Sequence, residues 1–258
     1  MPFARYLERI RDSLFSATGI QVTVHRRRRH RCAYEVRYEY QKQFVRFDIQ
    51  PGDRVLDVGS GGDPFPHATV LIDRFLGMSS SRTVPLATDN KPLAIADVHC
   101  LPFPDRAFDF VYCAHVLEVI ENPLNACSEL MRVGKRGFIE TPTAGKDILF
   151  AWTKESRNQR WQVVANGQSL CFFEYSPREL EGVRSAVWRD LVFSQRQNPI
   201  QNMFEANQDV FNVMFTWHDR FSVFVFRLDG TIETLNTVFD SRSPELVMAR
   251  RARAALAR

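Results

Sequence analysis

The sequence has 258 residues, 45% of them hydrophobic, and a formal net charge of +4. A chain of this size can bury the core of one compact α/β domain. Charged residues interrupt the N-terminus where a signal peptide would be apolar, and no apolar run approaches the roughly 20 residues that span a bilayer. The five cysteines show no CxxC pair. We therefore expect a cytoplasmic protein with reduced cysteines and no metal site.

The basic charge is concentrated in two places. Residues 26–31 read RRRRHR, and four arginines follow between residues 250 and 258. Such runs can contact nucleic acid, anionic lipid or a phosphorylated substrate, although a solvated flank is the simpler reading. The first run lacks the aromatic side chains that stack on single-stranded nucleic acid. We expect residues 1–31 to form a basic N-terminal arm with a short helix near 3–15, and nucleic acid is disfavoured as a partner.

Helix-like and strand-like segments alternate along the rest of the chain. Apolar residues at three- to four-residue spacing predict a helix over 32–48, which the turn at 51–53 ends. The elements predicted after this turn are strands at 54–58, 69–73, 93–97, 108–113 and 136–140, with helices near 115–119 and 123–132. This alternation predicts a parallel sheet with helices on both faces.

The C-terminal part predicts antiparallel pairing. The strand-like runs 209–217 and 221–228 are joined by only three residues, and a parallel pair would need a much longer crossover. We therefore expect an antiparallel hairpin at the end of the sheet. Upstream, Asn166-Gly167 lies between two further apolar runs and predicts a second hairpin.

A glycine-rich turn follows the first predicted strand. Residues 55–63 read VLDVGSGGD, and glycines there let the backbone approach a ligand closely. Two acids, Asp73 and Asp97, follow at the ends of the next two strands. A glycine loop followed by strand-end acids is the order that holds a nucleoside-bearing cofactor across the top of a parallel sheet.

Residues 53–141 resemble a class I S-adenosylmethionine-dependent methyltransferase of the type 11 kind. The resemblance rests on VLDVGSGGD, LIDRF, ADVHCLPFPDRAFDFVYCAHVLEVIENP and SELMRVGKRGFIETP, in that order. It implies a Rossmann-like, mostly parallel sheet over residues 32–258, with S-adenosyl-L-methionine as cofactor. In this fold the segment 142–209 would be a substrate cap over the carboxyl edge of the sheet. A peripheral hairpin or a dimer contact is the alternative for that segment.

The resemblance also assigns cofactor contacts. Asp57 would lie near the sulfonium and the amino-acid tail, Asp73 would accept from the ribose hydroxyls, and Asp97 would accept from the adenine amine. The other residues expected to line the cofactor are Gly59, Ser60, Gly61, Val98, His99 and Cys113. For each acid the alternative is structural: a solvated strand end or, for Asp57, a carboxylate held by loop amides.

Two positions depart from the family pattern. Asp63-Pro64 replaces the usual third glycine, and so few residues separate Gly59 from Asp73 that the helix after the loop must be very short or absent. Leu117-Glu118-Val119 stands where the family commonly has Leu-Glu-His, so no role for that histidine carries over.

Methyl transfer is an in-line displacement that depends mainly on alignment, and some enzymes of this kind need no base. His115 follows the fourth strand and could take a proton from a hydroxyl acceptor, because histidine titrates near neutrality. Glu140 is the second candidate and His218 the third. Each could equally be structural.

The sequence lacks the Asn/Asp-Pro-Pro-aromatic run and the Pro-Cys dipeptide typical of enzymes that methylate nucleic-acid bases. We therefore expect O-methylation of a small molecule: a sugar, a glycan precursor or a secondary metabolite. The entrance to the site is expected around Trp152, Arg157, Arg160, Trp161 and Phe173.

Two other functions stay open. An NAD(P)-dependent oxidoreductase shares the order of strand, glycine loop and acid. A non-catalytic protein of the same fold could bind nucleic acid or membrane through its arginine run. A homodimer is also left open.

Overall fold

The computed structural model describes residues 33–77, 85–150, 158–176, 179 and 207–237. The chain divides into two compact units, Met1–Ala33 and Tyr34–Arg258, and nearly all the described residues belong to the second. The helix predicted near 3–15 and the basic run at 26–31 lie outside the described residues.

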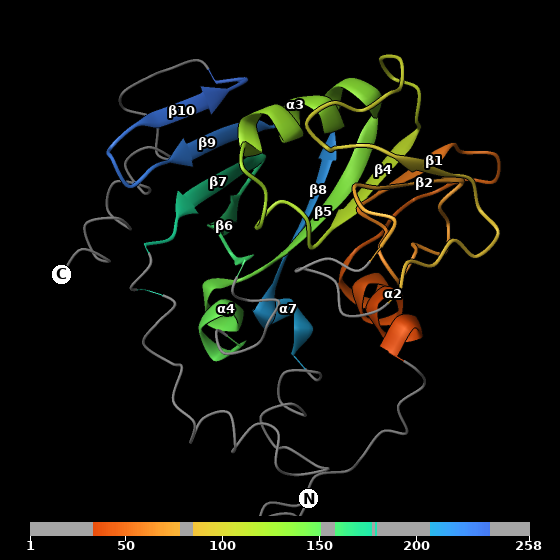
Figure 1. The fold of residues 1–258 in the computed structure, drawn as a ribbon, viewed down its shortest axis with the longest axis horizontal. Helices are drawn as coiled ribbons and strands as arrows, with labels where there is room; N and C mark the ends of the chain where they lie inside the picture. The colour runs from red at the N-terminus through yellow and green to blue at the C-terminus, as the bar shows by residue number, and fades with distance from the viewer. Residues whose placement is uncertain (1–32, 78–84, 151–157, 177–178, 180–206, 238–258) are drawn as a thin grey trace, which may run out of the picture. The chain divides into compact units, whose positions relative to one another are not determined.

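The described central sheet has the strand order β3-β2-β1-β4-β5-β8 (Figure 1). The first five strands are parallel, and β8 pairs with β5 in the antiparallel sense. This confirms the mostly parallel sheet expected from the sequence. The strands are β1 (Val55–Val58), β2 (Val70–Asp73), β3 (Leu93–Ile95), β4 (Phe110–Ala114), β5 (Arg136–Pro142) and β8 (Asn212–His218).

Helices cover both faces of this sheet, as predicted. Strands β1 and β4 are buried on both faces, which explains their continuous apolar sequences. On one face, Tyr38 of α2 (Ala33–Phe44) packs with Phe47 and Phe65 against the sheet. On the other face lies α3 (Pro123–Val133), whose first turn is capped by the side chain of Asn122.

A second, four-stranded sheet lies beside α3 in the order β10-β9-β7-β6 (Figure 1). Its apolar residues join those of α3 and of the central sheet in one core cluster. The Asn166-Gly167 hairpin is confirmed: β6 and β7 are antiparallel, and Gly167 has a φ of +57°. The strands of this sheet are β6 (Trp161–Asn166), β7 (Ser169–Glu174), β9 (Ser222–Phe226) and β10 (Ile232–Leu235).

The predicted pairing of 209–217 with 221–228 is wrong, because these runs enter different sheets. Strand β8 pairs with β5, whereas β9 pairs with β7 in parallel and with β10 in an antiparallel C-terminal hairpin. At the link, Asp219 has a φ of +55°, and Phe221 is buried against Trp217. The backbone N–H of Phe221 donates to the sulfur of Met131 in α3 at 3.2 Å. These contacts direct the chain out of the central sheet and into the second one. A link of three residues is compatible with this change of sheet as well as with a hairpin.

The helix predicted near 115–119 is also wrong, since those residues form a turn in which His115 has a φ of +58°. The expected absence of a helix after the glycine loop is confirmed, because residues 59–69 contain only turns and bends. The described residues also include the short helices α4 (Ala144–Phe150) and α7 (Gln208–Phe211). Among the described helices, none has the length and apolar character needed to cross a bilayer.

Candidate active site

The glycine loop, residues 59–62, is hydrogen-bonded to β2 and contacts the turn after β4. Gly59 and Gly61 have φ values of +73° and +56°, which glycine adopts without strain. The N–H groups of Gly59 and Ser60 donate to the carbonyl of Ile72 at 2.8 and 3.1 Å. A Cβ on Gly59 would lie only 2.3 Å from Cγ2 of Val116. The loop therefore touches the residue that follows His115.

Asp57 lies buried in β1, and its Oδ2 accepts a hydrogen bond from the N–H of Phe65 at 2.7 Å. Burial raises the pKa of Asp57 to about 7, although the Phe65 hydrogen bond opposes the shift. This contact is the alternative role considered from the sequence, in which Asp57 holds the loop. Nearby, Oγ of Ser60 is buried without a hydrogen-bond partner among the described residues.

Asp73 ends β2 and touches the glycine loop directly. Its Oδ2 accepts from the N–H of Gly61 at 3.0 Å, and its Oδ1 accepts from the N–H of Phe75 at 2.9 Å. The acid expected to face the ribose is therefore fixed in orientation by two backbone amides.

Asp97 lies just beyond β3, and its Oδ1 accepts from the N–H of His99 at 3.0 Å. The same oxygen lies 2.5 Å from Nδ1 of His99, and Oδ2 lies 3.2 Å from Nε of Arg74. Burial alone would raise the pKa of Asp97, but the hydrogen bonds from His99 outweigh it and lower that pKa. Val98 and Cys113 are both buried in the core cluster on the α3 face. Burial raises the pKa of the Cys113 thiol well above its usual range, so this thiol is not a nucleophile.

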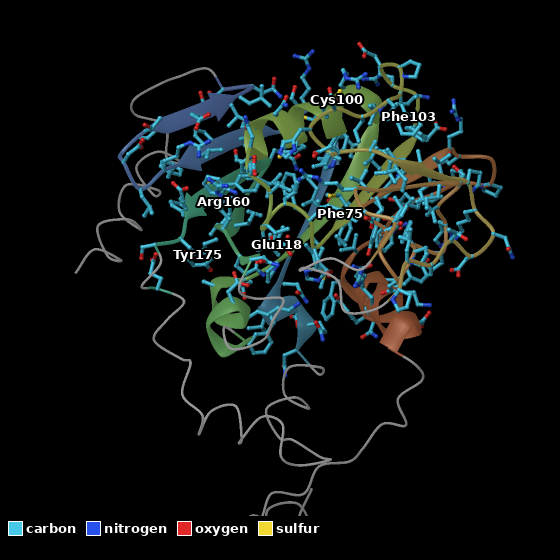
Figure 2. The ribbon with its side chains drawn as sticks, in the orientation of Figure 1. Phe75, Cys100, Phe103, Glu118, Arg160 and Tyr175 are labelled. Carbon is cyan, nitrogen blue, oxygen red and sulfur yellow. The ribbon has the colours of Figure 1, made fainter. Side chains whose placement is uncertain are left out.

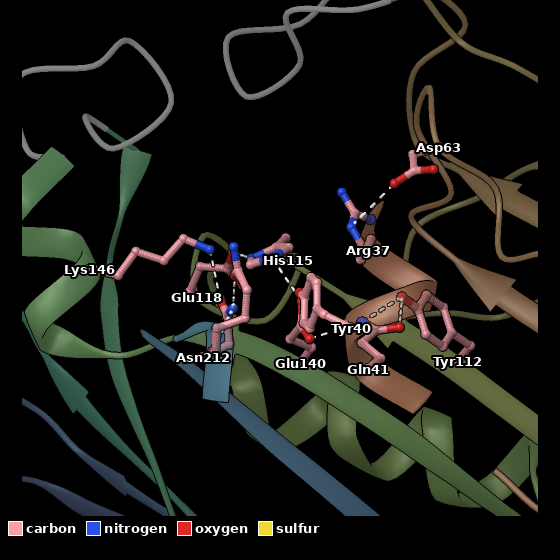
Figure 3. Close-up of polar contacts among 11 residues, drawn as sticks. Arg37, Tyr40, Gln41, Asp63, Tyr112, His115, Glu118, Glu140, Lys146 and Asn212 are labelled. Atoms are coloured by element: carbon pink, nitrogen blue, oxygen red, sulfur yellow. Dashed lines mark hydrogen bonds and ion pairs between the residues drawn. The ribbon is translucent and has the colours of Figure 1, made fainter. Parts of the chain in front are cut away.

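The structure brings the two leading proton-transfer candidates together (Figure 3). Nε2 of His115 lies 3.0 Å from Oε1 of Glu140, and the backbone N–H of His115 donates to the Glu140 carbonyl at 2.8 Å. Nδ1 of His115 lies 3.4 Å from Oε1 of Glu118. The imidazole therefore sits between two carboxylates at the carboxyl ends of β4 and β5.

Glu140 is fully buried, yet it is held ionised. Tyr40 OH donates to its Oε1 at 2.7 Å, and Nε2 of Gln41 donates to its Oε2 at 2.8 Å. Burial alone would raise the pKa of Glu140, but His115, Gln41 and Tyr40 outweigh that effect and hold the pKa at about 2.

Several further polar groups of this site were missed from the sequence. Lys146 of α4 donates to Oδ1 of Asn212 at 2.6 Å, and burial lowers the pKa of Lys146 to about 8. Its neighbour Asp147 accepts from Tyr175 OH at 2.9 Å, and burial raises the pKa of Asp147 to about 7. The other missed residues are Arg37, Tyr40, Gln41 and Glu118. A signal was present: Arg37, Tyr40 and Gln41 share one face of a helix at i, i+3 and i+4.

The described residues expected around the substrate entrance lie in different surroundings. Trp161 is a core residue, fully buried, and its indole N–H donates to the carbonyl of Ile120 at 2.7 Å. Phe173 stacks on Phe226 in the second sheet. The backbone N–H of Arg160 donates to the Glu118 carbonyl at 2.8 Å, so Arg160, Glu118 and Tyr175 gather at one place (Figure 2). Trp152 and Arg157 lie outside the described residues.

His218, the third proton-transfer candidate, is exposed and pairs with Arg136 at the start of β5. It therefore lies at the opposite end of β5 from Glu140 and does not join the site.

Comparison with known protein families gives one match. Residues 56–139 match the family model described as a methyltransferase domain. This match identifies residues 56–139 as a methyltransferase domain. S-adenosylmethionine is the cofactor that this domain implies, so the expected enzyme class and cofactor are confirmed at the level of the domain. A comparison with curated proteins gave no match.

Solved structures similar to the methyltransferase domain are distant. One is the cyclase SpnF, which is 23% identical to this chain with a TM-score of 0.29. The match covers 36% of this chain and 40% of SpnF. A methyltransferase of Thermotoga maritima shares 15% identity over 70% of this chain and 77% of its own, with a TM-score of 0.40. The YcgJ protein of Bacillus subtilis shares 14% identity over 71% of this chain and 94% of its own, with a TM-score of 0.37. Such distant similarity says nothing of the substrate.

The residues present fit the implied cofactor. S-adenosylmethionine carries a sulfonium cation, two ribose hydroxyls and an adenine amine, which carboxylates can bind. The carboxylates of Asp57, Asp73 and Asp97 lie in or just beyond three adjacent strands, and Asp73 contacts the glycine loop directly. The buried Oγ of Ser60, without a partner among the residues described, is a further polar atom that a ligand in the loop could satisfy.

Proposed function

We propose that this methyltransferase domain methylates a hydroxyl group of a small molecule, with His115 as proton acceptor and Glu140 as the residue that positions it. A sugar, a glycan precursor or a secondary metabolite is the acceptor class expected from the sequence. The observation that carries the proposal is the contact between His115 and Glu140 beside the glycine loop.

The contact between His115 and Glu140 suits a general base because it determines which ring nitrogen of His115 carries a proton. With a proton-bearing Nε2 donating to ionised Glu140, Nδ1 of His115 is the atom that takes the proton from the acceptor, and Glu118, 3.4 Å away, would stabilise the positive charge that results. The main chain of His115 is fixed by the hydrogen bond from its N–H to the Glu140 carbonyl and by the contact of Val116 with Gly59, and the ring is held by its contacts with Glu140 and Glu118. Glu140 is thus a positioning residue.

The bound cofactor supplies a methyl group on positively charged sulfur. The chain's own residues hold it: in our proposal Asp73 accepts from the ribose, Asp97 with His99 and Val98 frames the adenine, and Cys113 packs beneath. Asp57 and the loop at residues 59–61 would face the amino-acid tail. Because described parts of the segment 142–209 bring Lys146 and Asp147 near the site, we also propose this segment as the substrate cap.

Calorimetric titration tests the cofactor assignment. We expect S-adenosylmethionine and S-adenosylhomocysteine to bind, NADH not to bind, and Asp73→Ala to weaken the binding by about tenfold or more. Asp219→Asn, which removes an exposed carboxylate at the other end of β5 and is tolerated at a φ of +55°, is the control. Binding of NADH alone would favour the oxidoreductase. Binding of no cofactor, together with salt-sensitive binding of nucleic acid or vesicles, would favour the non-catalytic alternative.

A further inference from the structure

Glu118 is a buried acid of the site with one carboxylate oxygen that accepts no hydrogen bond from the described residues. Its side chain is only 3% exposed, and it lies in the turn after β4 (Figure 3). Its Oε1 lies 3.4 Å from Nδ1 of His115, whereas its Oε2 is buried and has no hydrogen-bond partner among the described residues. A buried carboxylate oxygen without a donor is costly, so one is retained where a ligand supplies the donor.

The charge of Lys146 interacts with that of Glu118, but the hydrogen bond and ion pair described for the two nearby cations go to other residues. Lys146 donates to Asn212, and Arg37 lies 3.3 Å from Asp63. Arg160, whose backbone N–H donates to the Glu118 carbonyl, has its guanidinium 3.8 Å from Oε1 of Glu174. Glu140 and Asp147 are acids whose own donors come from tyrosine and glutamine side chains and from His115. The charge of Glu118 contributes to the raised pKa of Asp147, which places the two acids in one electrostatic environment. Such surroundings favour a cationic donor on the ligand.

We infer that the acceptor is an amino alcohol or amino sugar, whose ammonium group donates to Oε2 of Glu118 while the neighbouring hydroxyl faces Nδ1 of His115. Groups on adjacent carbons can reach both residues because Glu118 and His115 are themselves in contact. Glu118 is then the residue that determines specificity. This inference rests on the proposed function, since it takes His115 as the proton acceptor.

Three matched probes test the inference on the protein saturated with S-adenosylhomocysteine: trans-2-aminocyclohexanol, trans-1,2-cyclohexanediol and cyclohexylamine. Calorimetry should show the amino alcohol binding at least about tenfold more tightly than the diol. Glu118→Gln should abolish this preference, and Glu118→Asp should retain part of it. Glu121→Gln removes an exposed carboxylate from the same loop and should leave the preference unchanged. With S-adenosylmethionine, mass spectrometry should find the new methyl group on oxygen.

Equal binding of amino alcohol and diol would overturn the inference. So would methylation of cyclohexylamine at nitrogen, which would make the amine itself the acceptor. Failure of every probe to bind, while S-adenosylhomocysteine binds normally, would also count against an amino alcohol acceptor and leave the cofactor assignment intact. Loss of cofactor binding in the wild type is the separate result that would defeat the proposed function.

Discussion

Glu140→Gln gives a quantitative test of how the site is built. The pKa of Glu140 is about 2 in the folded protein, against an ordinary value of 4.5. A group with a depressed pKa stabilises the folded state above its unfolded pKa and loses that contribution as pH falls through the folded pKa. The difference corresponds to about 3 kcal/mol. We expect the stability advantage of the wild type over Glu140→Gln to shrink by about this amount between about pH 5 and pH 2, with about half lost by pH 3.5.

The free energies of unfolding are to be measured by urea denaturation at a series of pH values. Glutamine preserves the size of the side chain and can still accept from Tyr40, so packing changes little. Glu121→Gln controls for the loss of one negative charge. A stability difference between wild type and Glu140→Gln that does not vary with pH would refute the view that His115, Gln41 and Tyr40 hold the carboxylate ionised.

Four further substitutions, one of them a control, test the loop and the sheet. Gly59→Ala should lower the free energy of unfolding by about 1–3 kcal/mol, because the new Cβ would lie 2.3 Å from Val116, and should weaken the calorimetric affinity for S-adenosylhomocysteine. Gly167→Ala is the control: its φ is also positive, at +57°, but its Cβ would meet no atom. It should lower the free energy of unfolding by only about 1 kcal/mol and leave the affinity unchanged. Burial raises the pKa of Asp57 from 3.8 to about 7, so wild-type stability falls as pH rises from about 4 to about 7 and is then constant. Asp57→Asn should therefore be more stable than wild type in urea by about 4 kcal/mol at pH 8 but not at pH 4. Gly137→Ala should cost about 3 kcal/mol or more in thermal or urea unfolding, because its Cβ would lie 2.3 Å from the Val111 carbonyl oxygen; a milder loss would contradict the close approach of β4 and β5.

The central sheet was predictable because its strands are buried on both faces. VLDV and FVYCA contain no alternation, and such runs between turn signals are typical of parallel strands. β10 was missed because its four residues are only half-buried and carry no strong pattern. The pairing of β9 was mistaken because the partner depends on Phe221 and Met131, which lie far apart in sequence.

From the sequence, candidate site residues could be placed near one another only where strand order alone positions them. Asp73 and Asp97 follow adjacent parallel strands, and such ends meet at one edge of the sheet. Tyr40 and Gln41 were not found, because their partner Glu140 lies about a hundred residues away and polar residues on a helix usually face water. Glu118 was passed over as the residue preceding a missing histidine.

The parallel pairing of β7 with β9 has a consequence for the order of folding. Strand β8 lies between them in sequence but belongs to the central sheet, so the second sheet gains its last two strands only after the chain has passed through β8. Contacts between such distant segments form slowly, because the entropy of closing the intervening loop is lost first. During synthesis the edge of β7 that later pairs with β9 therefore stays unpaired until β9 has been made. Premature termination after β8 would leave that edge exposed to other chains.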